Sequence, residues 1–566
     1  MSKASLELGG GNWAAKDGNI LGYAVGDTSG KYLPREFTFS RGADIAATRV
    51  NKDGLIEKCR ENLLLQSNQF DTTWENIRSS DSSGEIGYDG SNNAWKFKDS
   101  IDNNTHRIDQ NVTLTNNSVY SFSIYAKEGE HNTLGVEIGN FSVTANYVLF
   151  NLSDGTTSET GSNIIDSSMT AVGNGWYRCS MTSLAGTADR LCMQVQTGST
   201  ASYTGNGTDG IYIQDAQLEY GLVATDYIES GSSTGKAGVL DNLPRIDYTS
   251  GSAQLLMEPS RTNYIEHSEY FNAWTKQAKV TITNNATTSP SGYNDASKYN
   301  ISGSTDRALD QSETLSSGAT YTFSMWVKAI VDTQIRVRSN GNEWSEIFTV
   351  LVSDGWKRIE STHTMVSTSY EIGFFDVSGS TGDRFYIWGA QLEEGSYATS
   401  YIPNYGTTLG VTRAFDLFSD ESYNDVLGNG DLSIFVDFDY AAPGRESSTT
   451  ALYVYSGSNN FGIKGTNPAS KQLQIYAGNG FTTNITFNTT EQATRIKALI
   501  RTNGSTVELF FNGAKQGTTM TFGGSLPYAW DDIRFTGSNS FLAKYNRVAI
   551  FTESLSDAEC IALTTV

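Results

Sequence analysis

The chain has few of the residues that metal sites, disulfide frameworks and membrane spans require. It contains only four cysteines, Cys59, Cys179, Cys192 and Cys560, and none lies in a C-x-x-C spacing. This pattern signals neither a zinc site nor a disulfide framework. No stretch approaches the roughly 18 apolar residues of a membrane span, and the opening residues MSKASLELGGGNW lack the apolar centre of a secretory signal. We therefore expect synthesis in a reducing cytoplasm and no membrane insertion.

Basic residues are also scarce relative to acidic ones. The sequence holds 40 Lys and Arg against 62 Asp and Glu, for a formal net charge of −22. Such a surface repels phosphate backbones and anionic lipids, which counts against binding to nucleic acid or to a membrane surface. Two explanations of the acidity remain open. It can serve solubility and suppress strand-edge aggregation, or it can supply carboxylates that bind calcium.

Proline is rare, with 8 residues in a chain of 566, whereas glycine is abundant, with 55. Tyr and Phe are plentiful, and Ser, Thr and Asn fill the gaps between apolar stretches. Short strands joined by polar, glycine-rich turns have this composition, and helical bundles do not. At about 150 residues per domain, the length predicts three to four domains. We predict an all-β protein.

The strongest signal in the sequence is an internal repeat. RENLLLQSNQFDTTW, from Arg60, is matched by RTNYIEHSEYFNAW, from Arg261, and YSFSIYAKEG, from Tyr120, is matched by YTFSMWVKA, from Tyr321. Further on, GNGWYRCSMT corresponds to SDGWKRIEST, and DGIYIQDAQLEYGLVATDYIE corresponds to GDRFYIWGAQLEEGSYATSYIP. Four blocks in the same order indicate one module made twice, with the length differences placed in loops.

Apolar residues recur at every second position within these blocks. The run from Tyr120 to Lys127 places its apolar side chains on one face, and the run from Tyr321 to Val327 repeats that register. Period-2 alternation predicts half-buried antiparallel strands. Each copy is therefore expected to form a β-sandwich.

The last part of the chain follows a different strand pattern. The run from Leu432 to Asp439 alternates, and Asn512-Gly513 after three apolar residues is a two-residue hairpin signal. Ser556 as an N-cap with Glu559 three residues later predicts a short terminal helix. We expect a third sandwich here.

The order of the blocks, together with the lead-in segments FSRGADIAATRVNKDGLIE and LPRIDYTSGSAQLLMEPSRTN, resembles the jelly-roll, carbohydrate-binding-like modules of tailed-bacteriophage virion proteins. That resemblance spans roughly residues 35–415. The run ending ELFFNG…YNRVAIFTESLSDAEC resembles laminin-G or concanavalin-A-like sandwiches. The two resemblances imply tandem antiparallel β-sandwiches with an irregular N-terminal arm. The expected parts are an arm and lead-in at 1–58, jelly rolls at 59–235 and 259–413, a linker at 236–258, and the third sandwich at 414–566.

No catalytic constellation emerges from the sequence. There is no G-x-S-x-G elbow, Walker loop or zinc spacing, and the four histidines (His106, His131, His267 and His363) form no H-x-H or H-E-x-x-H pattern. Polysaccharide-cleaving proteins use paired acids, but 62 acids scattered along the chain give no pairing signal. The short, evenly repeated rungs of a parallel β-helix are missing as well. We predict a protein that is not an enzyme, with a glycan hydrolase as the alternative.

A sugar-binding site needs an aromatic face that stacks on the pyranose ring and polar groups that bind its hydroxyls. Tyr386, Trp388 and Gln391 in the second copy are the candidates, with packing inside the sheet as the alternative explanation. The first copy has Gln214-Asp215 at the matching position, so the aromatic platform is expected to be missing there.

Calcium is the cofactor that the acidic loops leave open, and no other cofactor is signalled. The acids most closely tied to the repeated blocks are Asp215, Glu219, Asp383 and Glu393. The alternative is that they are solvated loop carboxylates.

The resemblances imply a structural protein on the surface of a tailed-phage virion, as a tail or head fibre, an appendage or a decoration subunit. They also imply that it is made in the host cytoplasm, docks to other virion proteins (capsid, portal or tail) through the N-terminal arm, and binds glycans of the host surface. Phage fibres are usually trimeric, so we expect a homo-oligomer, with a trimer favoured by analogy. The alternatives are decoration without a specific ligand and a bacterial glycan-binding adhesin.

Overall fold

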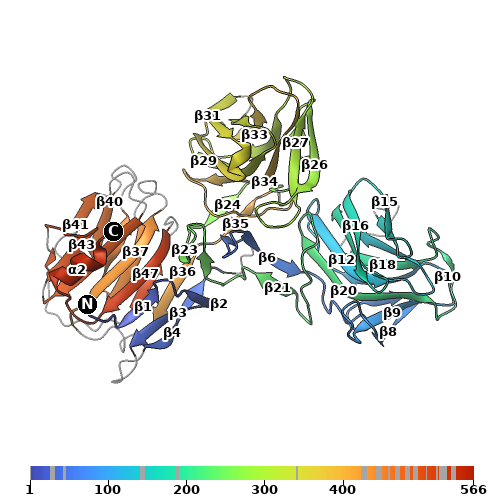
Figure 1. Ribbon diagram of the computed structural model, residues 1–566, viewed down its shortest axis with the longest axis horizontal. Helices are drawn as coiled ribbons and strands as arrows, with labels where there is room; N and C mark the ends of the chain where they lie inside the picture. The colour runs from blue at the N-terminus through green and yellow to red at the C-terminus, as the bar shows by residue number, and fades with distance from the viewer. Residues whose placement is uncertain are drawn as a thin grey trace.

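The computed structural model consists of three β-rich lobes with short paired strands between them (Figure 1). Almost every described element is an antiparallel strand, and the described residues contain one α-helix, α2 (Asp557–Thr564). The predicted all-β class is therefore confirmed. None of the helices in the described part is long and apolar enough to cross a membrane. The structure describes residues 2–25, 32–42, 46–139, 147–186, 190–339, 342–421, 430–440, 449–456, 459–465, 472–478, 485–488, 495–504, 506–517, 520–521, 532–536 and 543–566.

The first module is the lobe at the right of Figure 1. Its strands are β7 (Glu75–Ile77), β8 (Ser79–Glu85), β9 (Ala94–Asp99), β10 (Asn103–Asn104), β11 (His106–Asn111), β12 (Val119–Lys127), β13 (Thr133–Ile138), β14 (Tyr147–Asn151), β15 (Thr156–Thr160), β16 (Ile164–Gly173), β17 (Trp176–Leu184), β18 (Arg190–Gln196), β19 (Tyr203–Thr204) and β20 (Gly210–Tyr220). One six-stranded sheet has the order β15-β14-β13-β18-β11-β7, and the other has the order β16-β17-β12-β20-β9-β8. The module is therefore a two-sheet sandwich.

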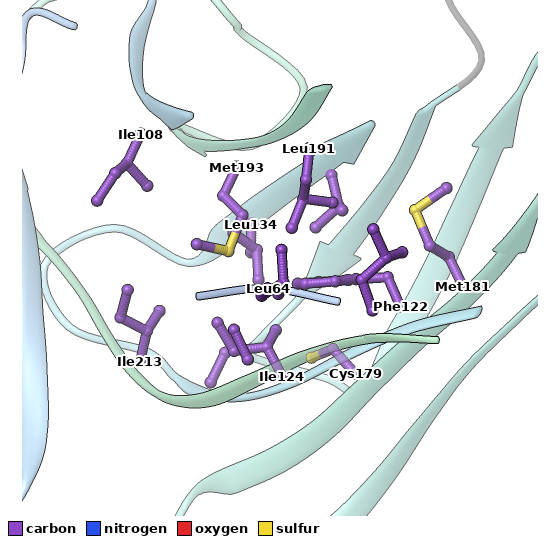
Figure 2. Close-up of a cluster of buried hydrophobic side chains, with 14 of the residues drawn as sticks. Leu64, Ile108, Phe122, Ile124, Leu134, Cys179, Met181, Leu191, Met193 and Ile213 are labelled. Carbon is purple, nitrogen blue, oxygen red and sulfur yellow. The ribbon is translucent and has the colours of Figure 1, made fainter. Parts of the chain in front are cut away.

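The core of the first module lies between these two sheets (Figure 2). Ile108, Leu134 and Met193 project from one sheet and meet Phe122 and Ile124 from the other, all fully buried. Because alternate residues of a strand point to opposite faces, the same strands also carry a second set of side chains that point away from this core.

The second module is the upper lobe of Figure 1. Its elements are η1 (Phe271–Ala273), β25 (Thr275–Lys276), β26 (Val280–Thr287), β27 (Ala296–Ile301), β28 (Leu309–Thr314), β29 (Thr320–Ala329), β30 (Thr333–Ser339), β31 (Asn342–Val350), η2 (Val352–Asp354), β32 (Trp356–Thr364), β33 (Ser369–Asp376) and β34 (Gly382–Glu394). The sheet orders are β25-β28-β33-β30-β31 and β26-β27-β34-β29-β32. Five strands of each sheet keep the order found in the first module, and only β15 and β16, at the sheet edges, have no counterpart. The shared order confirms the duplication predicted from the sequence.

A lead-in hairpin precedes each module, and a strand that follows the module pairs with the last strand of the lead-in segment. The first hairpin joins β5 (Thr48–Val50) to β6 (Ile56–Asn62), and β21 (Gly235–Gly238) pairs with β6. The second hairpin joins β22 (Arg245–Asp247) to β23 (Gln254–Met257). It is followed by β24 (Arg261–Asn263), which pairs with β35 (Val411–Arg413). These strands occupy the middle of the molecule, between the lobes (Figure 1).

The third lobe contains both ends of the chain (Figure 1). Its elements are β1 (Leu6–Gly9), β2 (Ala14–Lys16), β3 (Asn19–Val25), β4 (Tyr32–Ser40), β36 (Leu417–Glu421), β37 (Ser433–Tyr440), β38 (Thr449–Ser456), β39 (Asn459–Gly465), β40 (Gln472–Gly478), β41 (Ile485–Asn488), β42 (Arg495–Asn503), β43 (Thr506–Phe511), β44 (Ala514–Lys515), β45 (Met520–Thr521), β46 (Asp532–Thr536), β47 (Ala543–Phe551) and α2. The terminal helix carries the predicted cap, because the Ser556 side chain accepts a hydrogen bond from the Glu559 amide.

The N-terminal segment corrects one expectation, because it is not an irregular arm. β1 pairs with β47 along four residues, from Leu6 opposite Ile550 to Gly9 opposite Arg547. β3 pairs with β4, and β4 pairs with β36. Leu6 and Leu8 are buried in the same core as residues from β37 and β42. The segment folds because its alternating apolar residues complete the core of the third lobe.

Each lead-in hairpin packs on the lobe that comes after its own module. Val50 and Ile56 of the first hairpin pack against Trp388 and Tyr401 of the second module. β23 of the second hairpin pairs with β47 of the third lobe. The first lead-in hairpin therefore connects the first module to the second. In the same way, the second lead-in hairpin connects the second module to the third lobe.

A buried cluster of five charged side chains lies where these connections meet. Arg245 Nη1 lies 2.6 Å from Glu258 Oε2, and its Nη2 donates to Asp416 Oδ2. Arg413 Nη1 lies 3.1 Å from Glu258 Oε2, and Arg41 Nη1 lies 3.2 Å from Asp416 Oδ1. These side chains, which we call the ion cluster, are at most 2% exposed. Burial opposes the charged form of Glu258, but Arg413 and Arg245 outweigh it and lower its pKa.

Candidate functional site

The candidate site of the first module is the side of the β13-β18-β11 sheet that points away from the core. Ile108, Leu134 and Met193 point inward, so the alternate residues Asp109, Glu137 and Gln194 point outward. Asp109, Glu137 and Gln194 are nevertheless between 1% and 3% exposed. We call the outward side chains of β11, β13 and β18 polar face 1. Buried polar groups on the outside of a sheet are unusual, because burial normally favours apolar side chains.

Asp109 is the central group of polar face 1. Its Oδ2 lies 3.0 Å from Arg190 Nη1 and 3.2 Å from Arg107 Nε. Its Oδ1 is buried and has no hydrogen-bond partner among the described residues, and the same holds for Gln196 Oε1. Burial raises the pKa of Glu137 to about 7, with Asp109 adding to the effect and Arg107 opposing it. The face therefore contains buried acceptors that have no hydrogen-bond partner among the described residues.

The second module carries a matching face on β28, β30 and β33, which we call polar face 2. Asp310 opposes Gly373 of β33, as Asp109 opposes Cys192 of β18. Asp310 Oδ1 lies 3.3 Å from Arg338 Nε without a hydrogen bond to it. Burial raises the pKa of Asp310 to about 6; the charge of Arg338 opposes the shift and that of Glu371 adds to it. The same strand position thus holds a buried carboxylate in both copies.

Gly373 gives Asp310 its place on polar face 2. A Cβ at residue 373 would collide with the Leu309 carbonyl oxygen and with the Asp310 carboxylate. A glycine inside a strand commonly marks such a close approach. Next to it on β33, Phe375 is partly buried and points outward, with the Arg307 guanidinium 5.5 Å from its ring centre. Polar face 2 therefore combines an aromatic ring with buried charged groups.

The structure places Trp388 inside the protein, so it is not the exposed platform expected from the sequence. Its exposed fraction is 0%, and its ring contacts Trp326 and Tyr401 at centroid distances of 5.4 and 4.7 Å. The first lead-in hairpin covers this aromatic group. The alternative explanation, packing, is the one that the structure supports for Trp388.

Gln391 is also buried, whereas Tyr386 is partly exposed. Gln391 donates to Glu393 (2.6 Å) and accepts from the Ile402 amide (2.6 Å). Both of its polar atoms are thus used inside the module.

The repeated Q-L-E motif forms a structural clasp in both copies. Glu219 accepts hydrogen bonds from Gln217 and from the Thr225 hydroxyl, each at 2.6 Å. Glu393 accepts from Gln391 and Thr399 in the same way. In each copy the carboxylate therefore holds the loop that follows the long strand, β20 in the first module and β34 in the second.

The four acids proposed for calcium do not converge. Asp215 accepts from the Tyr88 hydroxyl at 3.1 Å, and Asp383 accepts from Lys298 at 3.0 Å, while Glu219 and Glu393 belong to the clasps. Within the described ranges, no group of three or more His, Cys, Asp or Glu side chains is placed to hold a metal ion. Calcium binding stays a prediction.

Two histidines that are distant in the sequence meet the same tyrosine in the first module. His106 and His131 have ring centroids 4.6 and 5.1 Å from that of Tyr203. His131 also lies 2.9 Å from Asp99 Oδ2 and 3.1 Å from Thr197 Oγ1. These contacts hold the segment from Thr197 to Thr204 against the sandwich. The spacing of the two histidines along the chain did not indicate that they meet.

Polar faces 1 and 2 were missed at the level of sequence, although a signal was present. HRIDQNVTL, from His106, matches RALDQSETL, from Arg307, at the offset of 201 residues that also relates the block from Tyr120 to its partner. The shared Asp-Gln pair contains Asp109 and Asp310. A polar pair that recurs inside an alternating strand indicates a common role in both copies.

Glu313, on β28 of the second module, has a buried carboxyl whose pKa can be tested. It stands at the position of Val112 in the first module, and its Oε1 is buried without a hydrogen-bond partner in the described structure. Burial raises the pKa of its carboxyl to about 8, and the nearby Glu266 adds to this shift. The folded state therefore prefers protonated Glu313, whereas the unfolded chain ionises near pH 4.

Glu313→Gln is expected to stabilise the protein at alkaline pH. Because the pKa is raised on folding, the stability that protonation provides is complete below about pH 4 and is lost as the pH rises toward about 8. The variant should gain up to about 5 kcal/mol at pH 8.5 and about nothing at pH 4. Urea unfolding at the two pH values measures this difference. Glu346→Gln, an exposed change on β31, is the control, and a wild-type pH slope in Glu313→Gln would contradict the assignment.

Comparison with known proteins gives one family match. Residues 263–378 match a carbohydrate binding domain family, and this segment contains β28, β30 and β33 of polar face 2. The match supports carbohydrate binding by the second module. No curated protein matches the sequence.

Several solved structures are similar at low identity. The CBM40 domain of the Ruminococcus gnavus IT-sialidase, bound to α2,3-sialyllactose, is 13% identical, with 25% of this chain and 91% of that chain covered and a TM-score of 0.21. The tandem CBM22 domains of Paenibacillus barcinonensis Xyn10C are 12% identical, with 63% and 100% covered and a TM-score of 0.22. The LG1-3 region of the laminin α2 chain is 9% identical, with 80% and 96% covered and a TM-score of 0.17.

Proposed function

We propose that this protein is a non-catalytic glycan-binding protein whose two modules hold carbohydrate on polar faces 1 and 2. The observation that carries the proposal is the buried carboxylate that recurs at one strand position, Asp109 in one copy and Asp310 in the other. The match of the second module to a carbohydrate binding domain supports it.

The physical argument rests on unfilled hydrogen-bonding capacity. A buried polar atom without a partner costs about 1–3 kcal/mol, which a bound hydroxyl can recover. Asp109 Oδ1 and Gln196 Oε1 are such atoms on polar face 1, and Arg338 Nε is one on polar face 2. Sugar hydroxyls both donate and accept, so they suit a face that mixes carboxylates, amides and guanidinium groups. Phe375 adds a ring on which the apolar side of a pyranose can rest.

We further propose that the protein is displayed on a tailed-phage virion, as a fibre, appendage or decoration subunit, and binds glycans of the host surface. The motif order that resembles virion proteins supports this placement, and a homo-oligomer, with a trimer favoured, follows by analogy. Decoration without a ligand and a bacterial adhesin are the competing functions. Immunogold labelling of purified particles tests the placement, and particles without label would overturn it.

In a chain that also carries Asp109→Asn, which disables polar face 1, Asp310→Asn and Phe375→Ala are each expected to weaken binding to bacterial polysaccharides at least a further tenfold, or about 1.4 kcal/mol. Asp310→Asn removes a charged acceptor, and Phe375→Ala removes the ring that stacks on the sugar. Affinity electrophoresis in gels that contain capsular or O-antigen polysaccharide measures the retardation of each variant.

Tyr386→Ala is the matched control, because Tyr386 is partly exposed and lies on the other sheet of the same module. Retardation should be unchanged in this variant. If Tyr386→Ala abolished binding while Asp310→Asn and Phe375→Ala kept it, polar face 2 would not be the site. A wild-type chain that is retarded by no polysaccharide would overturn the proposed function.

A further inference from the structure

A cavity of about 490 Å³ lies where the first lead-in hairpin meets both modules. Its walls come from β6, from the loop after β20, and from two loops of the second module, residues 291–295 and 403–411. We call it the junction cavity. It is separate from polar faces 1 and 2, because none of its lining residues belongs to their strands. Its volume is within the roughly 300–1,000 Å³ range of small-molecule sites.

Tyrosines and aliphatic side chains form part of the walls of the junction cavity. Tyr220, Tyr293 and Tyr405 line it, together with Leu222 and Val223. The rings of Tyr220 and Tyr405 are stacked, with centroids 5.7 Å apart and an interplanar angle of 18°. Aromatic rings of this kind provide flat apolar contact area for the carbon–hydrogen face of a ligand ring.

Polar groups reach into the same space, and two of them are incompletely used. Glu269 is 2% exposed; its Oε1 accepts from Lys58 (2.8 Å) and from the Tyr401 hydroxyl (2.9 Å). Its Oε2 is buried with no hydrogen-bond partner among the described residues, and so is Arg60 Nη1. Two side chains that line the cavity therefore each carry a buried polar atom without a hydrogen-bond partner, one an acceptor and one a donor.

The charge of the lining selects against an anion. Carboxylates outnumber basic groups by five to two. Lys58, one of the two basic groups, is already bound by Glu269, with Asp295 3.8 Å away. Burial opposes the charged form of Lys58, but Glu269, Tyr405 and Asp295 outweigh it, and its pKa is raised. A neutral ligand with several hydroxyls meets both the unfilled donor and the unfilled acceptor without added charge.

We propose that the junction cavity binds a neutral saccharide of one or two rings. The ring face contacts the tyrosines, one hydroxyl donates to Glu269 Oε2, and another accepts from Arg60 Nη1. A bound sugar would contact the lead-in hairpin and both modules at once. Binding would therefore fix the position of one module relative to the other. This site goes beyond the proposed function, which uses polar faces 1 and 2 only.

The test measures binding of glucose, galactose, N-acetylglucosamine, maltose and lactose to the full chain by saturation-transfer NMR and calorimetry. Wild-type protein should bind at least one of these probes. Arg60→Gln removes the donor and Val223→Trp fills the space, so each should weaken that binding at least tenfold. Arg261→Gln alters the residue that corresponds to Arg60 in the second copy, lies outside the junction cavity, and should leave binding unchanged.

Two results would overturn the proposal for the junction cavity. One is a wild-type protein that binds none of the five sugars. The other is sugar binding that persists in both Arg60→Gln and Val223→Trp, with circular dichroism confirming that at least one of them is folded. Retardation in polysaccharide gels, measured on the same variants, reports separately on polar faces 1 and 2. Failure of the cavity proposal would therefore leave that retardation intact.

Discussion

Replacing Arg245 with methionine is expected to lower the free energy of unfolding by about 3–5 kcal/mol, because it leaves buried carboxylates without a partner. Arg245 binds Glu258 and Asp416, and it also donates to the Thr48 carbonyl oxygen (3.2 Å) and the Ser400 hydroxyl (2.8 Å). One side chain thus joins both lead-in hairpins, the second module and the segment that enters the third lobe. Denaturant unfolding monitored by fluorescence measures the loss of free energy. In calorimetry we expect the lobes of the variant to melt in separate transitions.

Arg49→Met is the matched control for the ion cluster. Arg49 precedes an apolar residue in the first lead-in hairpin as Arg245 does in the second, but it pairs with Glu57 at a site where both side chains are more than a fifth exposed. Partly exposed pairs contribute about 0–1 kcal/mol. Equal stability of Arg245→Met and Arg49→Met would show that the ion cluster does not hold the lobes together.

Trp388→Ala is expected to cost about 3–5 kcal/mol, the usual penalty for emptying the space of a buried tryptophan. Val50 and Ile56 pack in the same buried group as Trp388. The first lead-in hairpin should therefore also lose its packing contact with the second module. The turn at Lys52 and Asp53 is exposed. Limited proteolysis there should therefore accelerate, and urea unfolding gives the change in free energy.

Tyr386→Ala, on the same strand as Trp388, is the control for the loss of buried packing. Tyr386 is partly exposed and lies outside the buried group around Trp388. Substitutions at such surface positions usually change stability by about 0.5 kcal/mol or less. A Trp388→Ala protein as stable as Tyr386→Ala, with unchanged proteolysis, would contradict the packing role.

The two explanations offered for Trp388 illustrate why the site was harder to predict than the fold. The run from Phe385 to Leu392 alternates, which predicts a strand but does not say what covers its outward face. The cover is the hairpin that contains Val50 and Ile56, more than 300 residues earlier in the chain. Local sequence carries no information about that partner, so an aromatic residue on an outward face has the same pattern whether it is exposed or covered.

The N-terminal segment shows the same limit for strand pairing. Leu6 and Leu8 alternate with Glu7 between them, but the family resemblances implied an irregular arm. Their partner β47 lies near the other end of the chain. Pairing over such a distance is fixed by the shared apolar core of the third lobe and not by the short segment itself.

The amino-acid sequence by itself determined the all-β class, the duplication and which residues of the repeated strands face the core, because each follows from alternation and repetition along the chain. Tertiary structure alone decided which outward faces are covered, that both ends of the chain share one lobe, and where Asp109, Asp310 and the junction cavity lie. The physical reason is that burial and unfilled hydrogen bonds depend on which segments meet in space. Those segments come from different lead-in hairpins and modules.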